Sequence, residues 1–390
     1  MRLRSAVEQE IRELIRRNGP ITFAQFMQYC LYSPRGGFYA ARGDRINAHF
    51  GTSPTSHPVF GALIAGQLVQ MWHLLGNPAV FHLIEVGSGD GALAYSIVDA
   101  CCRLYPRFAK SIKYVATDYE PGGLQTPDEP FNWYPVIAED SPSRQVIVSN
   151  IQRVKGEGLR AIRNVVGCIL SNELIDNFPV HRFVIQGGRI QEIFVTLEEG
   201  NLTEALGALS SPRIEERLSG LGLPLPEGFR GEVNLALEDW TEQLASALDR
   251  GFILTIDYGE LAPDLYSPNN SRGTMVCHHR HSVNDDPYQH IGKQDITCQV
   301  EFTSLMEIGH QYGLTTVGYT KQNKFLEFLG LSSFLDTLQT LGLSAARTEL
   351  NRIAMMTLVD AEEYGDFKVL AQAKGIELEF DLQGFRVHPT

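Results

Sequence analysis

The sequence has no apolar run that approaches the roughly 20 residues that a membrane-spanning helix needs. Its six cysteines include no C-x-x-C pair, which is typical of reduced residues rather than of a disulfide framework. We expect neither a secretory signal nor a transit peptide, because the chain begins with MRLRSAVEQEIREL, which mixes arginine with glutamate and has no apolar core. These features predict a cytoplasmic protein without a membrane span.

Positive charge is also scarce. The 390 residues include 33 lysines and arginines against 46 aspartates and glutamates, a formal net charge of −13. Nucleic acids are bound chiefly through clusters of lysine and arginine, so we expect no nucleic-acid partner. An acidic protein is compatible with a cationic substrate. Hydrophobic residues make up 43% of the chain, which is ordinary for a globular enzyme with a large core.

Apolar strands alternate with amphipathic helices along most of the chain. Capping patterns predict two helices near the start, one after Ser5 with Glu8 and one after Thr22 with Gln25. Further expected helices lie at about 59–75, 92–104, 238–251 and 302–314, and expected strands at 81–86, 111–118, 167–172, 252–259, 315–320 and 367–373. This alternation predicts an α/β fold with a mostly parallel sheet covered on both faces.

Four consecutive segments are expected: an N-terminal helical region with a pocket loop (1–76), the first part of the core (77–180), an inserted subdomain (181–235) and the second part of the core (236–390). The insert opens with a hairpin at 181–197, which turns at the Gly187-Gly188 pair. Two segments, 132–136 and 144–150, compete for the third strand, and the pattern does not decide between them.

The stretch LIEVGSGDGALA (83–94) is a strand, a glycine turn and a helix start, which is how α/β proteins hold a nucleotide. Read with Gly87, Gly89 and Ala92, it satisfies the dinucleotide fingerprint. Glu85 and Asp90 flank the turn, however, and a pyrophosphate would approach two carboxylates there. S-adenosylmethionine (SAM) has no phosphate and carries an ammonium and a sulfonium, so the acidic turn favours SAM over a dinucleotide.

Two later segments could complete such a site. Asp118 closes the second strand, where an adenosine cofactor needs an acceptor for its ribose hydroxyls; Glu120 is the second choice, and a simple turn at Asp118 is the alternative. In SNELID, a helix after the strand would place Glu173 and Asp176 on one face, able to grip a guanidinium and accept its proton. Alternatively, Asn172 only caps that helix.

The loop CHHRHSVNDDPYQH concentrates cysteine, histidine and aspartate, among them Cys277, His278, His279 and His281. Its spacings match no standard zinc pattern, so we predict no metal and a polar loop beside a pocket.

Several motifs of this sequence occur in the same order in a known family. They include ITFAQFMQYCLYSPRGGFY near the start, GTSP with FG at 51–61, IEVGSGDGALA, SNELIDNFPVHRF, IDYG, RGTMVCHHRH, DDP, GKQDITCQVEFT and the late FKVL. With them the chain resembles the MidA family of SAM-dependent methyltransferases, which includes the mitochondrial arginine methyltransferase needed for assembling respiratory complex I. Three positions depart from the family pattern: Thr55 stands in place of a carboxylate, and His278 and His279 in place of aromatic residues.

The resemblance implies a seven-stranded Rossmann-like class I SAM-methyltransferase sheet with N-terminal helices and an inserted hairpin or lid subdomain. It places the cofactor and the catalytic groups in the motifs already quoted. The implied cofactor residues are Glu85, Gly87, Gly89, Asp118, Thr52, Ser53 and Pro54; the implied catalytic residues are Asn172, Glu173 and Asp176; and the implied substrate-side residues are Asp257, Tyr258, Gly259, Gly273, Thr274, His281 and Asp295.

The leading hypothesis is therefore transfer of a methyl group from SAM to an arginine of a partner protein, with a respiratory complex subunit as one candidate. Two alternatives stay open: a non-catalytic SAM-binding assembly factor and an NAD(P)-dependent oxidoreductase. A small-molecule acceptor is also compatible with the fold. The sequence leaves the oligomeric state open, a homodimer included.

Overall fold

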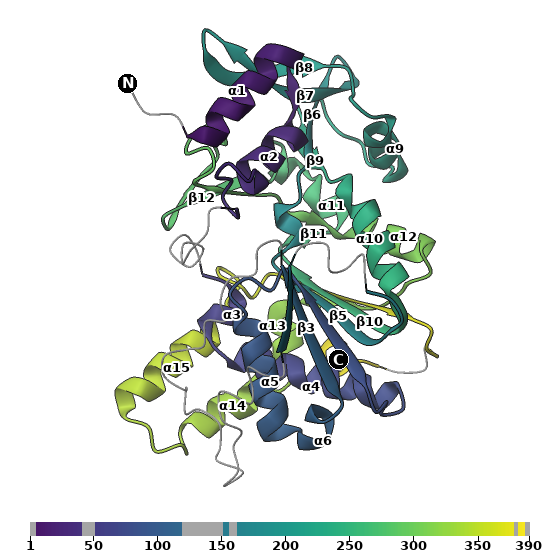
Figure 1. The fold of residues 1–390 in the computed structure, drawn as a ribbon, viewed down its shortest axis with the longest axis vertical. Helices are drawn as coiled ribbons and strands as arrows, with labels where there is room; N and C mark the ends of the chain where they lie inside the picture. The colour runs from purple at the N-terminus through teal and green to yellow at the C-terminus, as the bar shows by residue number, and fades with distance from the viewer. Residues whose placement is uncertain (1–4, 41–50, 119–150, 156–161, 378–380, 387–390) are drawn as a thin grey trace. The chain divides into compact units, whose positions relative to one another are not determined.

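A computed structural model describes residues 5–40, 51–118, 151–155, 162–377 and 381–386 (Figure 1). The chain forms two compact units, each assembled from separate stretches of sequence. Unit 1 comprises Met1–Phe50, Ile175–Trp240 and Gly259–Ile308, and unit 2 comprises Gly51–Leu174, Thr241–Tyr258 and Gly309–Thr390. The four consecutive segments predicted from the sequence cut the chain at other points, because residues far apart in sequence pack into the same unit.

Unit 2 contains a sheet of seven strands in the order β16-β17-β10-β5-β2-β3-β4. The strands are β2 (Phe81–Val86), β3 (Ile112–Asp118), β4 (Ile151–Lys155), β5 (Val165–Asn172), β10 (Leu248–Asp257), β16 (Thr315–Lys321) and β17 (Lys368–Lys374). Strands β4, β3, β2, β5 and β10 are parallel, whereas β17 and β16 are antiparallel to their neighbours. The parallel strands end at the same edge, which brings the ends of β2, β3 and β5 together.

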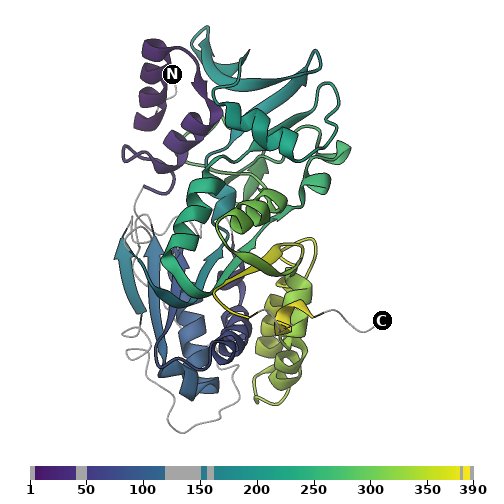
Figure 2. The same ribbon diagram turned by 90° about the vertical axis from the view of Figure 1, so that its right-hand side faces the viewer.

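The helices of unit 2 pack around this sheet. They are α3 (Ser53–Ser56), α4 (Val59–Leu74), α5 (Ala92–Leu104), α6 (Pro106–Ala109), α13 (Gln322–Phe328), α14 (Leu331–Leu338) and α15 (Ala345–Thr357). Helix α4 is apolar over most of its length and is buried against α5 and the sheet. Figure 2 shows the yellow-green helices α13 to α15 as one group, and residues of α14 and α15 join the same core. These three helices have no counterpart in the sequence prediction.

Unit 1 is built on an antiparallel sheet in the order β1-β7-β6-β9, with β8 paired to β7. Its strands are β1 (Ile21–Thr22), β6 (His181–Gln186), β7 (Arg189–Glu198), β8 (Asn201–Gly207) and β9 (Arg230–Val233), and its helices include α1 (Ala6–Asn18), α2 (Phe23–Tyr32) and α9 (Pro212–Gly220). The hairpin prediction is confirmed, because Gly187 and Gly188 both adopt positive φ in a two-residue turn.

Both N-terminal helix predictions are confirmed in unit 1. The hydroxyl of Ser5 accepts the N–H of Glu8 at the start of α1, and Thr22 and Gln25 form a reciprocal capping box at the start of α2. The apolar stripes of the two helices share one core.

Short elements complete the description. In unit 1 they are η1 (Ile175–Asn177), β11 (Gly259–Glu260), α11 (Ala262–Leu265), η2 (Pro268–Asn270), β12 (Val276–His279), β13 (Ser282–Asn284), β14 (Asp295–Thr297) and β15 (Val300–Glu301). Helices α10 (Ala236–Ala247) and α12 (Phe302–Gln311) each run from one unit into the other, and η3 (Gln383–Phe385) belongs to unit 2.

Two sequence predictions need correction or qualification. The helix expected at 238–251 ends at Ala247, because strand β10 begins at Leu248 and pairs with β5. Strand β4 pairs with β3 and begins at Ile151, just after the second candidate segment for the third strand. Both candidate segments, 132–136 and 144–150, lie outside the described residues.

Because β5 pairs closely with β2, residue 167 should tolerate no side chain, and this can be tested. A β-carbon at this position would lie 2.0 Å from the carbonyl oxygen of His82, and φ is +150°. We expect Gly167→Ala to lower the free energy of unfolding by about 2–4 kcal/mol, because backbone atoms cannot yield. Gly313→Ala is the control, since its φ is also positive but no described residue lies within 4 Å of the added carbon. Equal losses in chemical denaturation would contradict the close approach.

Candidate functional site

The glycine turn after β2 is fastened to the end of β3. The N–H groups of Gly87 and Ser88 both donate to the carbonyl of Thr117, at 2.9 and 3.0 Å. Gly87, Gly89 and Gly91 all have positive φ, which only glycine adopts readily. At Gly87 a β-carbon would also lie 2.7 Å from the side chain of Leu174.

Asp118 closes β3 beside this turn. Its Oδ2 accepts the N–H of Gly89 at 2.6 Å, so this carboxylate lies at the glycine turn, and its contact with a ribose stays a prediction. Among the described residues Oδ1 has no hydrogen-bond partner, and it can accept a hydroxyl of a ribose. Glu120, the second choice, lies outside the described residues.

Glu85 lies in the core of β2 rather than on the open side of the turn. It is buried, and its Oε2 accepts the hydroxyl of Tyr114 at 2.8 Å from the neighbouring strand. Burial raises the pKa of Tyr114 well above its usual range, and the Glu85 charge raises it further, so the phenol stays protonated as a donor. A buried carboxylate is stabilised by nearby positive charge. The sequence had indicated Glu85 but not Tyr114.

The turn fits the cofactor that its charge pattern predicts. Among the described residues a β-carbon at Gly89 would meet nothing within 4 Å, which leaves room for a ligand beside the backbone as far as these residues decide it. Asp118 offers an acceptor on one side, and Glu85 supplies a negative charge below the turn. These residues suit an adenosine that carries positive charge and no phosphate.

Strand β5 ends in a second polar cluster of unit 2. The Oε1 atom of Glu173 accepts the Nδ2 of Asn172 at 2.9 Å and the backbone N–H of Ser53 at 3.1 Å. Ser53 is 120 residues away in the sequence and begins helix α3. The structure thus brings together a predicted cofactor residue and two predicted catalytic residues.

Glu173 does not begin a helix. Its φ is +48°, a left-handed conformation that a glutamate adopts only when its surroundings impose it, and its N–H donates to Ile256 at 2.9 Å. The prediction of a helix that carries Glu173 and Asp176 on one face is therefore wrong, and so is the alternative that Asn172 caps it. The chain forms only the 3₁₀ turn η1, and Asp176 belongs to unit 1.

Asp257 supports this bend from the end of β10. Its Oδ2 accepts the N–H of Leu174 at 3.1 Å and its Oδ1 accepts the N–H of Tyr258 at 3.0 Å. Asp257 is buried, and its two hydrogen bonds stabilise the backbone of the segment that follows Glu173. The Tyr258 ring packs on Phe367 with centroids 5.4 Å apart.

The segment at 52–56 holds the other side of Glu173. The N–H of Thr52 donates to the hydroxyl of Thr55 at 3.0 Å, so threonine serves as a capping acceptor where the family has a carboxylate, and Pro54 occupies the first turn. Gln322, a buried residue that the sequence analysis missed, hydrogen-bonds the Ser53 hydroxyl. Only the tertiary fold reveals it, since it lies 269 residues from Ser53.

Unit 1 holds the remaining predicted acids. Asp295 on β14 is buried, and its Oδ2 lies 2.8 Å from the hydroxyl of Tyr39 while its Oδ1 accepts the Nδ2 of Asn177 at 3.1 Å. Burial raises the pKa of Asp295 to about 8, and the nearby charge of Asp176 adds to the rise. Tyr39 and Asn177 were not singled out in the sequence.

His281 lies in the turn between β12 and β13, where it is exposed and has a φ of +60°. The rings of His279 and His290 stack with centroids 4.1 Å apart. Across the described residues, no group of three or more histidine, cysteine, aspartate or glutamate side chains is arranged to hold a metal ion. The substrate-side role of His281 stays a prediction.

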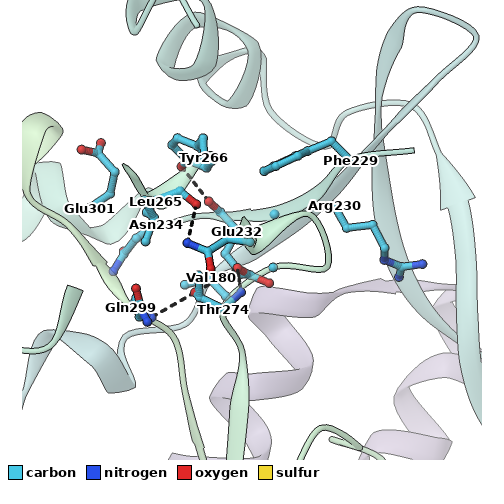
Figure 3. A pocket seen from close by; sticks show the side chains of 13 residues that line it. Val180, Phe229, Arg230, Glu232, Asn234, Leu265, Tyr266, Thr274, Gln299 and Glu301 are labelled. Atoms are coloured by element: carbon cyan, nitrogen blue, oxygen red, sulfur yellow. Dashed lines mark hydrogen bonds between the residues drawn. The ribbon is translucent and has the colours of Figure 1, made fainter. Parts of the chain in front are cut away.

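A pocket in unit 1 surrounds Glu232 (Figure 3). The Oε2 atom of Glu232 accepts the N–H and the hydroxyl of Thr274, at 2.8 and 3.1 Å. Its Oε1 lies 3.9 Å from the Nε of Arg182, and neither atom has a hydrogen-bond partner among the described residues. A β-carbon at Gly273 would lie 2.2 Å from Oε1, so glycine is required there.

Comparison with known proteins places the chain in a family. Residues 63–320 match the sequence pattern of a family described as "Putative S-adenosyl-L-methionine-dependent methyltransferase". The match spans well over half of the chain, so the protein belongs to this family of SAM-dependent methyltransferases. The resemblance drawn from the sequence is confirmed, and SAM is the cofactor.

The chain is similar to named relatives over most of its length. It is 26% identical over 389 residues to the mitochondrial protein arginine methyltransferase NDUFAF7 homolog of Drosophila melanogaster, covering 95% of this chain and 85% of that one. It is 26% identical over 349 residues to the human mitochondrial protein arginine methyltransferase NDUFAF7, covering 83% and 73%.

A solved structure supports the fold and the cofactor. A protein from Burkholderia thailandensis, bound to S-adenosyl-homocysteine, aligns with a TM-score of 0.80 at 25% identity and covers 99% of this chain and 96% of that one. The expected α/β methyltransferase fold is thereby confirmed. In the described part of the chain, no helix is long and apolar enough to cross a membrane.

The raised pKa of Asp295 predicts a pH-dependent stability. Between about pH 4, the pKa of an unfolded aspartate, and pH 8, the folded state holds one proton more than the unfolded state. The Asp295 contribution to the free energy of unfolding is therefore full below pH 4 and is lost as pH rises to 8, by up to about 1.4 kcal/mol per pH unit.

Asp295→Asn cannot ionise and lacks this dependence. We expect the difference in unfolding free energy between the natural protein and this variant to fall across that window and to level off above pH 8. Asp285→Asn, an exposed neighbour in the sequence, is the matched control. A constant difference in urea titrations from pH 4.5 to 8.5 would show that Asp295 is ionised throughout.

Proposed function

We propose that this protein transfers a methyl group from SAM to a side-chain nitrogen of arginine in a partner protein. The observation that carries the proposal is the Glu173 carboxylate, held at the end of β5 by Ser53 and Asn172 beside the glycine turn of the same sheet. Support for arginine comes from the relatives, which are named protein arginine methyltransferases.

The chemistry needs little more than alignment and a proton acceptor. The guanidinium nitrogen attacks the methyl carbon, the carbon–sulfur bond breaks, and the sulfonium sulfur keeps the bonding pair and becomes neutral. The nitrogen then loses one proton, and the product guanidinium keeps its charge. A carboxylate can pair with the fork of a guanidinium and accept that proton. Glu173 is proposed for both tasks, and the catalytic role expected of Asp176 from the sequence stays a prediction.

The strained backbone of Glu173 fits a positioning role. A left-handed glutamate costs free energy and is kept only where several contacts determine it, and such residues concentrate at functional sites. Here the N–H donates to Ile256 while Oε1 accepts two hydrogen bonds, so both ends of the residue are held. A side chain fixed in this way loses little entropy when a substrate binds.

We also propose a role for the inserted subdomain, a class of partner and a location in the cell. Within the expected seven-stranded class I architecture, the inserted hairpin subdomain is proposed as a lid over the substrate. The partner is proposed to be a protein with an exposed arginine, with a respiratory complex subunit as one candidate. A cytoplasmic location is proposed from the sequence, whereas the relatives are named mitochondrial.

A non-catalytic assembly factor is the main competing function. It would keep the SAM site and hold a partner without transferring a methyl group. The oxidoreductase alternative loses its basis, because family membership assigns SAM and not a dinucleotide to the glycine turn. Methyl transfer itself therefore separates the two functions that remain.

Glu173→Gln tests the proposal. The amide keeps the size of the side chain but can neither pair with a cation nor accept a proton. We expect kcat for transfer of labelled methyl from SAM to arginine to fall by about 10²–10⁴-fold, since general-base catalysis contributes about that much. The dissociation constant for SAM should change by less than about threefold, because the glycine turn is untouched.

Glu327→Gln is the control, since Glu327 is exposed on α13 in the same unit and pairs with Lys324. If Glu173→Gln transfers methyl groups at the natural rate, the proposed role of Glu173 is wrong. If partner maturation survives in cells while transfer is lost, catalysis is not the function.

A further inference from the structure

Strand β8 forms an open edge of the antiparallel sheet in unit 1. Its ladder with β7 runs without a register shift from Asn201, opposite Glu198, to Gly207, opposite Glu192. On the other side of β8, no described strand is paired with it. An unpaired edge presents a row of backbone N–H and C=O groups to which another strand can add.

The hairpin turn decides which backbone groups of β8 point outward. Glu199 and Gly200 both have positive φ in a two-residue turn, so Glu198 and Asn201 form the hydrogen-bonded pair that closes the hairpin. Hydrogen-bonded and non-hydrogen-bonded pairs then alternate along the ladder. Three residues therefore turn their N–H and C=O groups away from β7: Leu202, Glu204 and Leu206. Across the described part of the chain, no hydrogen bond reaches these outward groups.

The β8 edge lacks the features by which proteins protect an open strand. Its sequence NLTEALG contains no proline and no lysine, and its ladder has no bulge. The edge strand β16 of unit 2 shows the contrast, because its register shifts between Thr316 and Gly318 and the ring of Phe385 lies against Gly318. A long edge without protection is a predicted site of pairing with another chain.

The side chains of β8 suit pairing with a second copy of the same strand. In an antiparallel pair with a two-fold axis at Glu204, each Leu202 lies opposite the partner's Leu206. Leu206 is 46% exposed in the single chain, and the opposite leucine would cover it. The three residues with outward groups then form three hydrogen-bonded pairs, each of which exchanges two N–H···O=C bonds.

The charges are compatible with this pairing. Each Glu204 carboxylate is held by the guanidinium groups of Arg182, at 2.7 Å, and Arg230, so the two carboxylates that meet at the axis are compensated. The same register places the exposed Glu199 of the turn beside the partner's segment that leads into α9. Arg213 lies in the first turn of α9, where the helix dipole is positive, so an acidic turn meets a basic helix start twice in one dimer.

We propose that two copies of this protein pair their β8 edges antiparallel and so join their unit 1 sheets into one continuous sheet. The contact is isologous, because the same residues face one another across the axis. One strand pair makes a small interface, so the dimer is reversible, with a dissociation constant on the order of 10 μM. The inference is independent of the proposed function, because no step of methyl transfer uses these backbone groups.

Analytical ultracentrifugation of the full chain between about 1 and 200 μM tests the association. We expect monomers at the low end of this range and dimers at the high end. Leu206→Lys should raise the dissociation constant at least about tenfold, because an edge lysine disfavours strand pairing. Leu206→Pro should have the same effect, since it removes an outward N–H and no bond to β7.

Leu350→Lys is the matched control, because Leu350 is 66% exposed on α15 in unit 2. This variant should dimerise as the natural protein does. A monomer at every concentration would overturn the proposal. So would a dimer that Leu350→Lys disrupts and Leu206→Lys leaves intact.

Hydrogen exchange resolved to single amides tests the register. The N–H groups of Thr203 and Ala205 point toward β7 and should be protected at every concentration. The outward amides of Leu202, Glu204 and Leu206 should exchange rapidly in the monomer and at least about tenfold more slowly in the dimer. Outward amides that are protected in the dilute monomer would show that the same chain covers the edge. Outward amides that stay unprotected in the dimer would show that the copies meet elsewhere, and either result overturns the proposal.

Discussion

The left-handed backbone of Glu173 is the constraint on which the polar cluster at the end of β5 depends. It ends β5, turns the chain and directs a carboxylate to the N–H of Ser53, all within one residue. Asp257 braces the next peptide from β10, so two parallel strands hold the bend. Without this turn the chain would continue as the helix that the sequence suggests, and the carboxylate would lie elsewhere. The free energy that the strained conformation costs is offset by these hydrogen bonds.

Acidic residues in the sheet have different tasks, and burial separates them. Glu85 is buried in β2 and accepts the hydroxyl of Tyr114, whereas Asp118 ties the glycine turn to β3 through the N–H of Gly89. In unit 1, burial raises the pKa of Asp295 to about 8. The formal net charge of −13 counts every carboxyl group as ionised, whereas the protonation state of each carboxyl group depends on its neighbours.

Local signals were read correctly from the sequence, and long-range ones were not. The capping boxes at Ser5 and Thr22 and the Gly187-Gly188 hairpin are confirmed, because each depends on residues a few positions apart. The contact of Ser53 with Glu173 depends on two segments that only the folded sheet brings together. The wrong helix at Glu173 has the same origin: the capping pattern is real in sequence, but the bond to Ile256 overrides it. Tyr39, Tyr114 and Gln322 have no local signal and became visible only through their partners.

The central claim is that this SAM-dependent methyltransferase modifies arginine in another protein. Quantitative mass spectrometry of the source proteome, with and without the gene, tests it most directly. The account predicts that methylation at one or a few arginines disappears in the absence of the protein and returns when it is restored. If every methylarginine is unchanged while another residue type or a small molecule loses its methyl group, the assignment to arginine is contradicted.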